Sequence, residues 1–167
     1  VVGSTRGTGS LFGSGSGEDL DGFVLALDPN NGMGDSAGVR ASTRINSPNS
    51  KDDWILNVCS DPNESNAFYI LGATMGYNET NVTQPAEGSI QPFVVKISAY
   101  TLVPTWWTQL EVKAFNSNPT DASGYGCVVN PVDNQVYVAG VVKDGAAMQF
   151  GDQSSKGKDD IFVAALR

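Results

Sequence analysis

Histidine is absent from the 167-residue sequence. Its absence excludes Ser-His-Asp and Cys-His nucleophile systems, histidine acid–base chemistry and every metal site that needs an imidazole ligand. Positive charge is also scarce, because 10 Lys and Arg residues face 18 Asp and Glu residues and give a net charge of -8. An acidic surface offers few cations to the phosphates of nucleic acid or to an anionic membrane. We therefore expect neither partner.

Long apolar runs are missing as well. No stretch approaches the roughly 18 apolar residues that a membrane span requires. Residues 1–3 carry neither a basic segment nor the apolar segment of a signal peptide, so any leader peptide would lie outside this sequence. Charged residues make up 17% of the chain, while Gly, Ser, Thr, Asn and Pro are abundant. Because no window shows a capped amphipathic helix, this composition predicts an all-β protein of short strands joined by loops.

Three N-glycosylation sequons are present, beginning at Asn63, Asn78 and Asn81. All three lie in polar, turn-rich stretches, where an acceptor asparagine is accessible. They predict passage through the secretory pathway, and therefore an extracellular or cell-surface location for a glycosylated protein.

A repeat runs through the chain. Residues 66–72 (NAFYILG) and 134–140 (NQVYVAG) match in Asn, Tyr and Gly at a constant spacing. Residues 1–5 (VVGST) resemble the end of the same strand and precede 70–74 (ILGAT) by almost the same spacing. Agreement between several matches on one period indicates a true internal repeat.

A second marker follows the first in each repeat. It is centred on Phe-Val and occurs in residues 21–27 (DGFVLAL), 91–97 (QPFVVKI) and 160–166 (DIFVAAL). Alternating, β-branched segments predict strands over 53–60, 67–75, 92–99, 105–115, 124–130, 135–143 and 160–166. The predicted long loops are 8–20, 77–91 and 144–159. Four antiparallel strands in each unit are typical of a β-propeller blade, although a period alone would also allow a β-solenoid.

The third unit resembles the seven-bladed β-propeller repeat family. The similarity rests on 137–140 (YVAG), the Phe-Gly pair at 150–151 and 158–166 (KDDIFVAAL). The second unit departs from the family pattern at Gln91-Pro92. The resemblance implies antiparallel four-stranded blades, and the spacing of the repeats makes each about 68–70 residues long, which is longer than the family's usual blade. The expected units are a partial blade over 1–46, a blade over 53–115 and a partial blade over 124–167.

About two and a half blades would not close a propeller, which typically has four to eight blades. An open stack would expose sheet edges. We therefore expect the chain to belong to a longer polypeptide, or to complete a ring or fibre with other chains.

Cys59 and Cys127 share the spacing of Gly72 and Gly140, and we expect them at equivalent positions on the strands nearest the propeller axis. A disulfide between them would tie neighbouring blades together in an oxidising compartment. Two buried thiols, or bridges to other segments, are the alternatives. A zinc site is not expected from two cysteines without histidine.

Acidic residues, in one case together with two asparagines, form four groups. They are Glu18, Asp19 and Asp21; Asp28, Asn30, Asn31 and Asp35; Asp52 and Asp53; and Asp159 and Asp160. Paired carboxylates could hydrolyse a glycoside, and oxygen-rich loops could hold calcium, but no group has the spacing of a known calcium loop. We expect structural roles, with Asp21 and Asp160 bonding the turns that enter their strands. No cofactor is expected.

Three tryptophans, Trp54, Trp106 and Trp107, are the remaining candidates. Trp106 and Trp107 should point to opposite faces of one strand, so we expect at most one of them in a core. An exposed tryptophan could stack on a sugar or contact another protein. The glycine-rich residues 7–17 lack the lysine and the helix of a phosphate-binding loop and are predicted to be a flexible loop.

These observations favour a structural or adhesive extracellular β-propeller that acts through protein–protein contacts, without enzymatic activity. Its expected partners are other copies or segments of the same polypeptide, other surface proteins and N-linked glycans, as in a wall, a matrix or a surface filament such as a flagellar hair. The alternative is a carbohydrate-binding or glycoside-hydrolysing propeller.

Overall fold

The structure is a computed structural model that describes residues 1–6, 19–28, 38–47, 51–76, 89–110, 113–114, 121–143, 148–150, 153–154 and 158–166. These residues contain no α-helix, and the protein is all-β as the composition predicts. The strands are β1 (Val2–Thr5), β2 (Asp21–Leu27), β3 (Val39–Ile45), β4 (Asp53–Ser60), β5 (Ala67–Thr74), β6 (Gln91–Ser98), β7 (Pro104–Gln109), β8 (Lys113–Ala114), β9 (Ala122–Val129), β10 (Val136–Val142), β11 (Met148–Phe150), β12 (Gln153–Ser154) and β13 (Asp160–Leu166).

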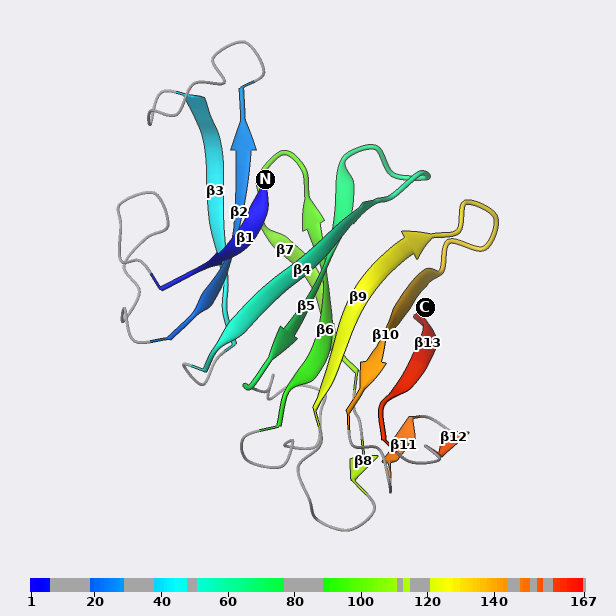
Figure 1. The fold of residues 1–167 in the computed structure, drawn as a ribbon. Helices are drawn as coiled ribbons and strands as arrows, with labels where there is room; N and C mark the ends of the chain where they lie inside the picture. Colours follow the sequence, from blue (N-terminus) through cyan, green and yellow to red (C-terminus); the bar gives the residue numbers. More distant parts are fainter. Residues whose placement is uncertain are drawn as a thin grey trace.

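The described strands form four antiparallel sheets (Figure 1). Strands β1-β2-β3 form the first unit, β4-β5-β6-β7 the second unit and β9-β10-β13 the third unit. In each unit the strands are paired in the order in which the chain reaches them. The fourth and smallest sheet consists of β8, β11 and β12.

The two recurring sequence markers lie opposite each other in adjacent strands. The register pairs Gly3 with Phe23, Gly72 with Phe93, and Gly140 with Phe162. A Cβ atom on any of these glycines would collide with the ring of its partner. The glycine recurs because the phenylalanine ring occupies the space where a side chain would stand.

Each unit has a backward face, toward the preceding unit, and a forward face, toward the following one. Side chains alternate between these faces along every strand. On β5, Ile70 belongs to the apolar cluster behind the second unit, whereas Tyr69 and Leu71 belong to the cluster in front of it. All three side chains are buried, so the central sheet is covered on both faces.

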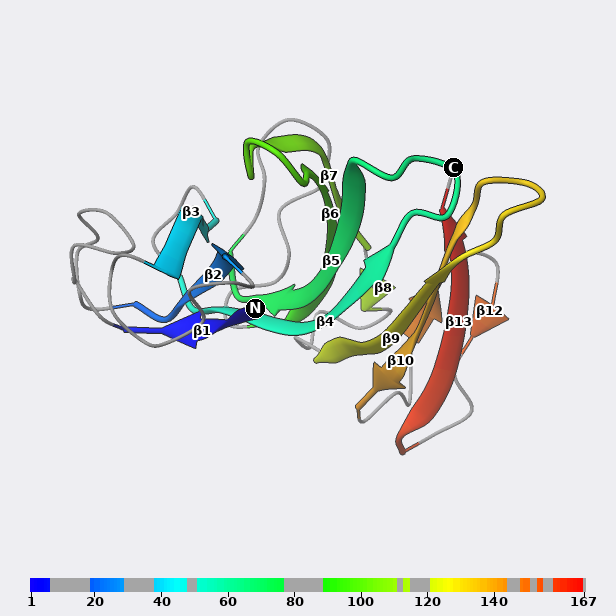
Figure 2. The same ribbon diagram turned by 90° about the horizontal axis from the view of Figure 1, so that it is seen from above.

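Two apolar clusters fill the spaces between the units. We call the contact between the first and second units the first joint; its cluster is Val24, Ile45, Ile55, Ile70, Phe93, Val95, Ile97 and Leu102. The second joint lies between the second and third units; its cluster is Tyr69, Leu71, Val94, Leu110, Ala122, Val129, Val136, Val138, Val142 and Phe162. The three larger sheets stand side by side (Figure 2), with β4 against β1 and β2, and β9 against β4, β5 and β6.

Two predicted boundaries are wrong. The strand predicted over 105–115 ends as β7 at Gln109, and residues 113–114 join a different sheet as β8. The predicted loop 144–159 contains β11 and β12. Among the described strands, β7 is an edge of its sheet and has no neighbour on its outer side with which pairing could continue beyond Gln109. Instead β8 pairs with β11, which comes from the other long connection.

The remaining strand predictions are confirmed to within two residues, and 53–60 coincides with β4. The predicted loop 8–20 lies outside the described residues except at its end, and so does the predicted loop 77–91, whose last residue begins β6.

Candidate functional site

The first strands of the second and third units, β4 and β9, correspond residue by residue. Ile55 lies opposite Gly72, and Gly124 lies opposite Gly140, so Ile55 and Gly124 are equivalent. Each strand then has an irregularity typical of a β-bulge, which passes over one residue. Because both strands skip a residue at the same point, the correspondence continues unchanged beyond the bulge.

The two cysteines are not at equivalent positions, so that expectation is wrong. Cys127 lies opposite Val138, and its equivalent in β4 is Val58, which lies opposite Ile70. Cys59 comes one residue after Val58, and successive side chains of a strand point to opposite faces. Cys59 therefore lies on the forward face of the second unit, whereas Cys127 lies on the backward face of the third.

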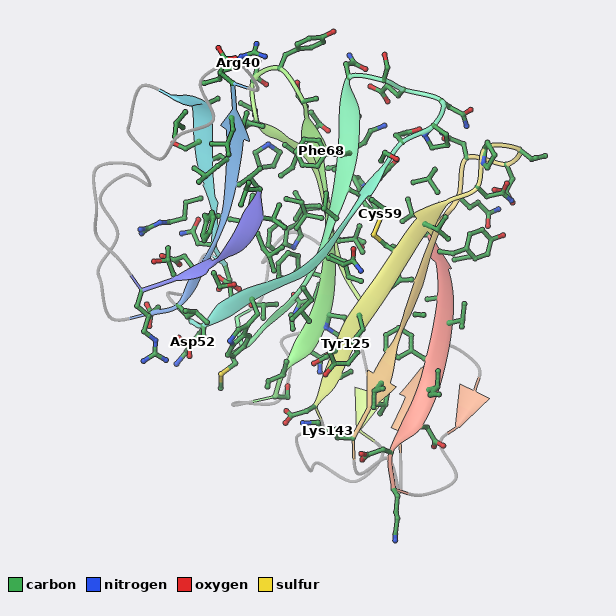
Figure 3. All side chains as sticks on the ribbon, turned by 45° about the horizontal axis from the view of Figure 1, so that its top comes forward. Arg40, Asp52, Cys59, Phe68, Tyr125 and Lys143 are labelled. Atoms are coloured by element: carbon green, nitrogen blue, oxygen red, sulfur yellow. A yellow bond between two sulfur atoms is a disulfide. The ribbon has the colours of Figure 1, made fainter. Side chains whose placement is uncertain are left out.

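A disulfide bond joins Cys59 to Cys127 across the second joint (Figure 3). Their Cα atoms are 5.9 Å apart, within the usual range for a disulfide. Both residues pack against the apolar cluster of the joint. The predicted bridge is thus present in place of free thiols. Equivalent positions would have pointed both thiols in the same direction.

Two asparagine side chains add polar contacts across the same joint. Asn57 Nδ2 donates a hydrogen bond to the carbonyl oxygen of Tyr125, at 2.8 Å. Asn63 Nδ2 donates to the carbonyl oxygen of Pro131, at 3.1 Å, and to Oδ1 of Asn134, at 3.2 Å. These hydrogen bonds extend the contact between the second and third units beyond the disulfide, from strands β4 and β9 into the turns that follow them.

Asn63 is also the first predicted glycosylation site. Its side chain is exposed in the turn between β4 and β5. A glycan would replace one of the two hydrogens on Nδ2, so glycosylation would leave one N–H to donate across the joint. Asn78 and Asn81 lie outside the described residues, and glycosylation at all three positions stays a prediction.

An aspartate holds each new unit to the one before it. Asp52 Oδ1 accepts the Leu20 N–H at 2.8 Å, and the next residue, Asp53, donates its N–H to the Leu20 carbonyl. In the third unit, Asp121 Oδ1 accepts the Ile90 N–H at 3.0 Å, and the residue after Asp121 donates to the Ile90 carbonyl. We call this pair of hydrogen bonds the aspartate clamp.

Sequence reasoning missed the clamp. It grouped Asp52 with Asp53 as an acidic pair and did not single out Asp121. The available signal was the separation of Asp52 and Asp121 in the sequence, which equals that of the equivalent residues Ile55 and Gly124. Both carboxylates accept a backbone hydrogen bond from the preceding unit; a structural role was expected for Asp52, and no role was predicted for Asp121.

Asp53 is fully buried at the start of β4. Its Oδ2 accepts the Ser47 N–H at 2.6 Å. Burial raises the pKa of Asp53 to about 6, and hydrogen bonds from Thr74 and Ser47 offset only part of that rise. The carboxylate secures the connection that leads from the first unit into the second.

The other acidic groups are only partly visible. Asp21 Oδ2 forms an ion pair with Arg44 at 2.9 Å, a partner on β3 that the sequence does not predict. Burial raises the pKa of Asp21, and the nearby Arg44 guanidinium counteracts that rise. Glu18, Asn30, Asn31 and Asp35 lie outside the described residues, as do residues 7–17. In the part of the chain that the structure describes, no three Cys, Asp or Glu side chains gather as metal ligands would.

A charged cluster lies at the turn end of the second joint. Lys96 Nζ contacts Glu64 Oε2 and lies 3.5 Å from Asp61 Oδ2. The Lys96 ammonium also lies 5.4 Å from the centre of the Tyr69 ring, and the Tyr69 hydroxyl donates to Asp61 at 3.4 Å. The hydrogen bond to Glu64 raises the pKa of Lys96, despite desolvation by burial. Burial raises the pKa of Tyr69.

Beside this cluster is an open pocket of about 390 Å³ between the second and third units. It is lined by Tyr69, Lys96, Trp106, Asn134, Val136 and Leu166. Trp106 meets Tyr69 edge to face, with ring centres 6.4 Å apart. Aromatic surface beside an ammonium group and a carboxamide can bind a polar ligand that also has an apolar face.

Trp106 and Trp107 are both half-buried and neither belongs to a buried cluster, as expected if at most one of them lies in a core. Trp106 packs against the cluster of the second joint, and Trp107 packs against that of the first. The Trp107 ring stacks on Phe93 with centres 4.5 Å apart. Both faces of the second unit are covered, so opposite directions bring both rings into apolar surroundings. Trp54 is half-buried on β4.

Among the described residues, no helix has the length and apolar character to cross a membrane. Neither family models, nor curated proteins, nor solved structures match this chain.

Proposed function

We propose that the protein is a structural or adhesive extracellular scaffold whose units are blades of a β-propeller. One observation carries the proposal: the same joint, with its aspartate clamp and apolar cluster, recurs between successive units. Units that repeat one packing arrangement form a rigid stack whose turns are available for contacts. No catalytic step is part of the proposal.

The extracellular setting is supported by the disulfide and the sequons. A Cys59–Cys127 bridge persists in an oxidising compartment, whereas cytosolic thiols are kept reduced. The resemblance to the seven-bladed β-propeller repeat family points to the same setting. A wall, a matrix or a surface filament such as a flagellar hair is the proposed context, and other copies or segments of the polypeptide, together with other surface proteins, are the proposed partners.

The test is the intact mass of the native particle before and after enzymatic removal of N-glycans. The proposal predicts a mass well above 17.6 kDa that falls on deglycosylation. An unglycosylated monomer of 17.6 kDa would contradict it. Ser65→Ala is the matched variant for Asn63, because it destroys the sequon and keeps the amide that donates to Pro131 and Asn134.

The pocket in the second joint favours carbohydrate binding as a second candidate function. Trp106 and Tyr69 offer apolar ring surface, while Lys96 and Asn134 offer polar groups. Sugars combine an apolar ring face with hydroxyl groups, and aromatic side chains match that face. A panel of neutral oligosaccharides should change the tryptophan fluorescence, and Trp106→Ala should abolish the change. Trp107→Phe, on the opposite face, is the control and should preserve it. Absence of any response would remove this candidate.

A further inference from the structure

The forward face of the third unit is apolar and open to solvent. Its side chains alternate outward from β9, β10 and β13; we call Val128, Tyr137, Ala139, Ile161 and Val163 the outer face. Val128, Ile161 and Val163 are 59%, 83% and 69% exposed. A shallow hollow of about 320 Å³ crosses this surface and is bordered by Val128, Tyr137, Ala139 and Val163.

The equivalent face of the second unit is buried. Its residues, by register, are Cys59, Tyr69, Leu71, Pro92 and Val94. Leu71, Pro92 and Val94 are fully buried, and Tyr69 is 6% exposed. The covering element is β9, the first strand of the next unit, which lies against β4, β5 and β6.

The first unit repeats this relationship. Val2 and Val24 are its forward-facing equivalents of Leu71 and Val94; Val24 belongs to the cluster of the first joint, and Val2 packs against that cluster. Strand β4, again the first strand of the next unit, lies against β1 and β2. The forward faces of the first and second units are therefore covered by equivalent elements, in each case the first strand of the next unit.

We infer that the outer face binds the first strand of a further repeat unit, packed as β9 packs on the second unit. The inference rests on the proposed scaffold function and names the partner that the scaffold requires. A second copy of the chain is not the occupant we propose, because its strands β4 and β9 are already packed against the units before them.

The residues of the outer face also determine whether this contact is polar or apolar, and whether it is covalent. Val128 stands where the second unit has Cys59, and Ala165 stands where it has Lys96. The equivalent of the disulfide and the equivalent of the lysine cluster are thus both missing from this face. The contact is therefore apolar and non-covalent, as in the first joint, and exposed apolar surface of this kind marks an interaction site.

The test lengthens the chain by one repeat. A second copy of residues 99–167, with its own Cys127 replaced by Ser so that it adds no free thiol, is appended after Arg167; it supplies a new first strand at the natural spacing. Val163→Cys is introduced into both the original and the lengthened chain, and the rate of its reaction with a maleimide is measured under oxidising conditions. Val132→Cys, in an exposed turn, is the control for general reactivity.

Docking should slow the labelling of position 163 at least tenfold in the lengthened chain and leave position 132 unchanged. Val128→Asp in the lengthened chain should restore fast labelling, because it places a charge in the contact. An appended segment that proteases digest, or one that folds while position 163 still reacts quickly, overturns the inference. Slow, concentration-dependent labelling of the original chain would show that a second copy occupies the face, and would also overturn it.

These outcomes are separate from those of the scaffold proposal. The labelling assay needs neither glycans nor a particular location. A protein that proves to be unglycosylated and monomeric would contradict the proposed function, and the labelling result would still decide whether the outer face accepts another unit.

Discussion

The two joints of the molecule share a backbone arrangement and differ in the side chains that secure it. Both contain an aspartate clamp and an apolar cluster. In the first joint, the remaining polar contacts include Ser4 Oγ, which accepts the Ile55 N–H at 3.0 Å, and an exposed ion pair between Arg6 and Asp52. The second joint adds a disulfide, asparagine hydrogen bonds and the Lys96 cluster beside it.

The difference shows how single residues specialise a repeated joint. Val58 occupies the position in β4 that is equivalent to Cys127, so the backward face of the second unit has no thiol for a preceding strand. The recurring backbone arrangement brings successive units together. Whether a disulfide then links them depends on one residue in each of the two units.

The two joints also differ in which side of the contact carries the large side chain and which side carries the glycine. In the first joint, Gly22 provides room for the large Ile55 side chain; in the second, Gly124 provides room for Leu71. Ile55 and Gly124 are equivalent positions, so the large residue has moved from one side of the contact to the other. Close packing is thus kept with a different distribution of volume.

Of the changes that test the difference between the two joints, removal of the disulfide should lower the free energy of unfolding the most. Replacing both cysteines, Cys59→Ser and Cys127→Ser, should lower the free energy of unfolding by about 4 kcal/mol, because the long loop between them is no longer closed. Denaturant unfolding with and without reductant measures the change. Reductant should bring the wild type to the stability of the variant and leave the variant unaffected. A double variant as stable as the oxidised wild type would contradict this assignment.

The second prediction concerns Asp53, which belongs to the first joint alone. Its pKa is raised from 3.8 to about 6 in the folded protein. The folded state therefore binds the proton more tightly, so stability from this group is present below pH 3.8 and is lost as the pH rises through about 6. The loss is about 3 kcal/mol. The Asp53→Asn variant has no ionisable group at this position, so its stability should not show this loss as the pH rises.

The measurement is the unfolding free energy of the wild type and of Asp53→Asn between about pH 3.5 and about pH 7.5. Subtracting the two curves removes the contribution of the other carboxylates. The variant should gain stability relative to the wild type as the pH rises. A difference that does not change with pH would refute the burial of an ionisable Asp53.

Gly22 in the first joint and Gly124 in the second allow a matched pair of substitutions, with a smaller expected loss of stability. Gly22→Ala places a Cβ 2.7 Å from Ile55, and Gly124→Ala places one 2.7 Å from Leu71. Each should cost about 1–3 kcal/mol through overpacking. Ile55→Ala should rescue the first variant, because it removes both Cγ1 and Cδ1, and Leu71→Ala should rescue the second. Exchanged pairings, such as Gly22→Ala with Leu71→Ala, should show no rescue. Rescue by the wrong partner would mean that the two joints are not separate contacts.

Much of the fold follows from local sequence signals. The alternation of residues 53–60 and the recurring Gly and Phe-Val markers predict strands and repeat, because strand periodicity and the glycine–phenylalanine contact are local or between adjacent strands. The ends of edge strands do not follow in this way. Pairing of β8 with β11 depends on where two long connections meet, and no short-range pattern encodes that.

The candidate site was predictable only in part. The cysteine pair could be found by counting, but its geometry depends on which face each thiol occupies. The cysteines are one residue closer in sequence than equivalent positions of β4 and β9, and a shift of one residue reverses the face. This becomes apparent only with the register of the two strands. Asp121 escaped notice because its partner is a backbone N–H, and backbone groups leave no mark in a sequence.

The recurrence of the joint is the central claim, and amide hydrogen exchange at Leu20 and Ile90 tests it most directly. Both N–H groups donate to clamp aspartates, so both should exchange slowly in the native protein. Asp52→Ala should speed exchange at Leu20 and leave Ile90 protected, whereas Asp121→Ala should do the reverse. Fast exchange at both amides in the wild type, or loss of protection at both in either variant, would contradict the account of two equivalent and separate joints.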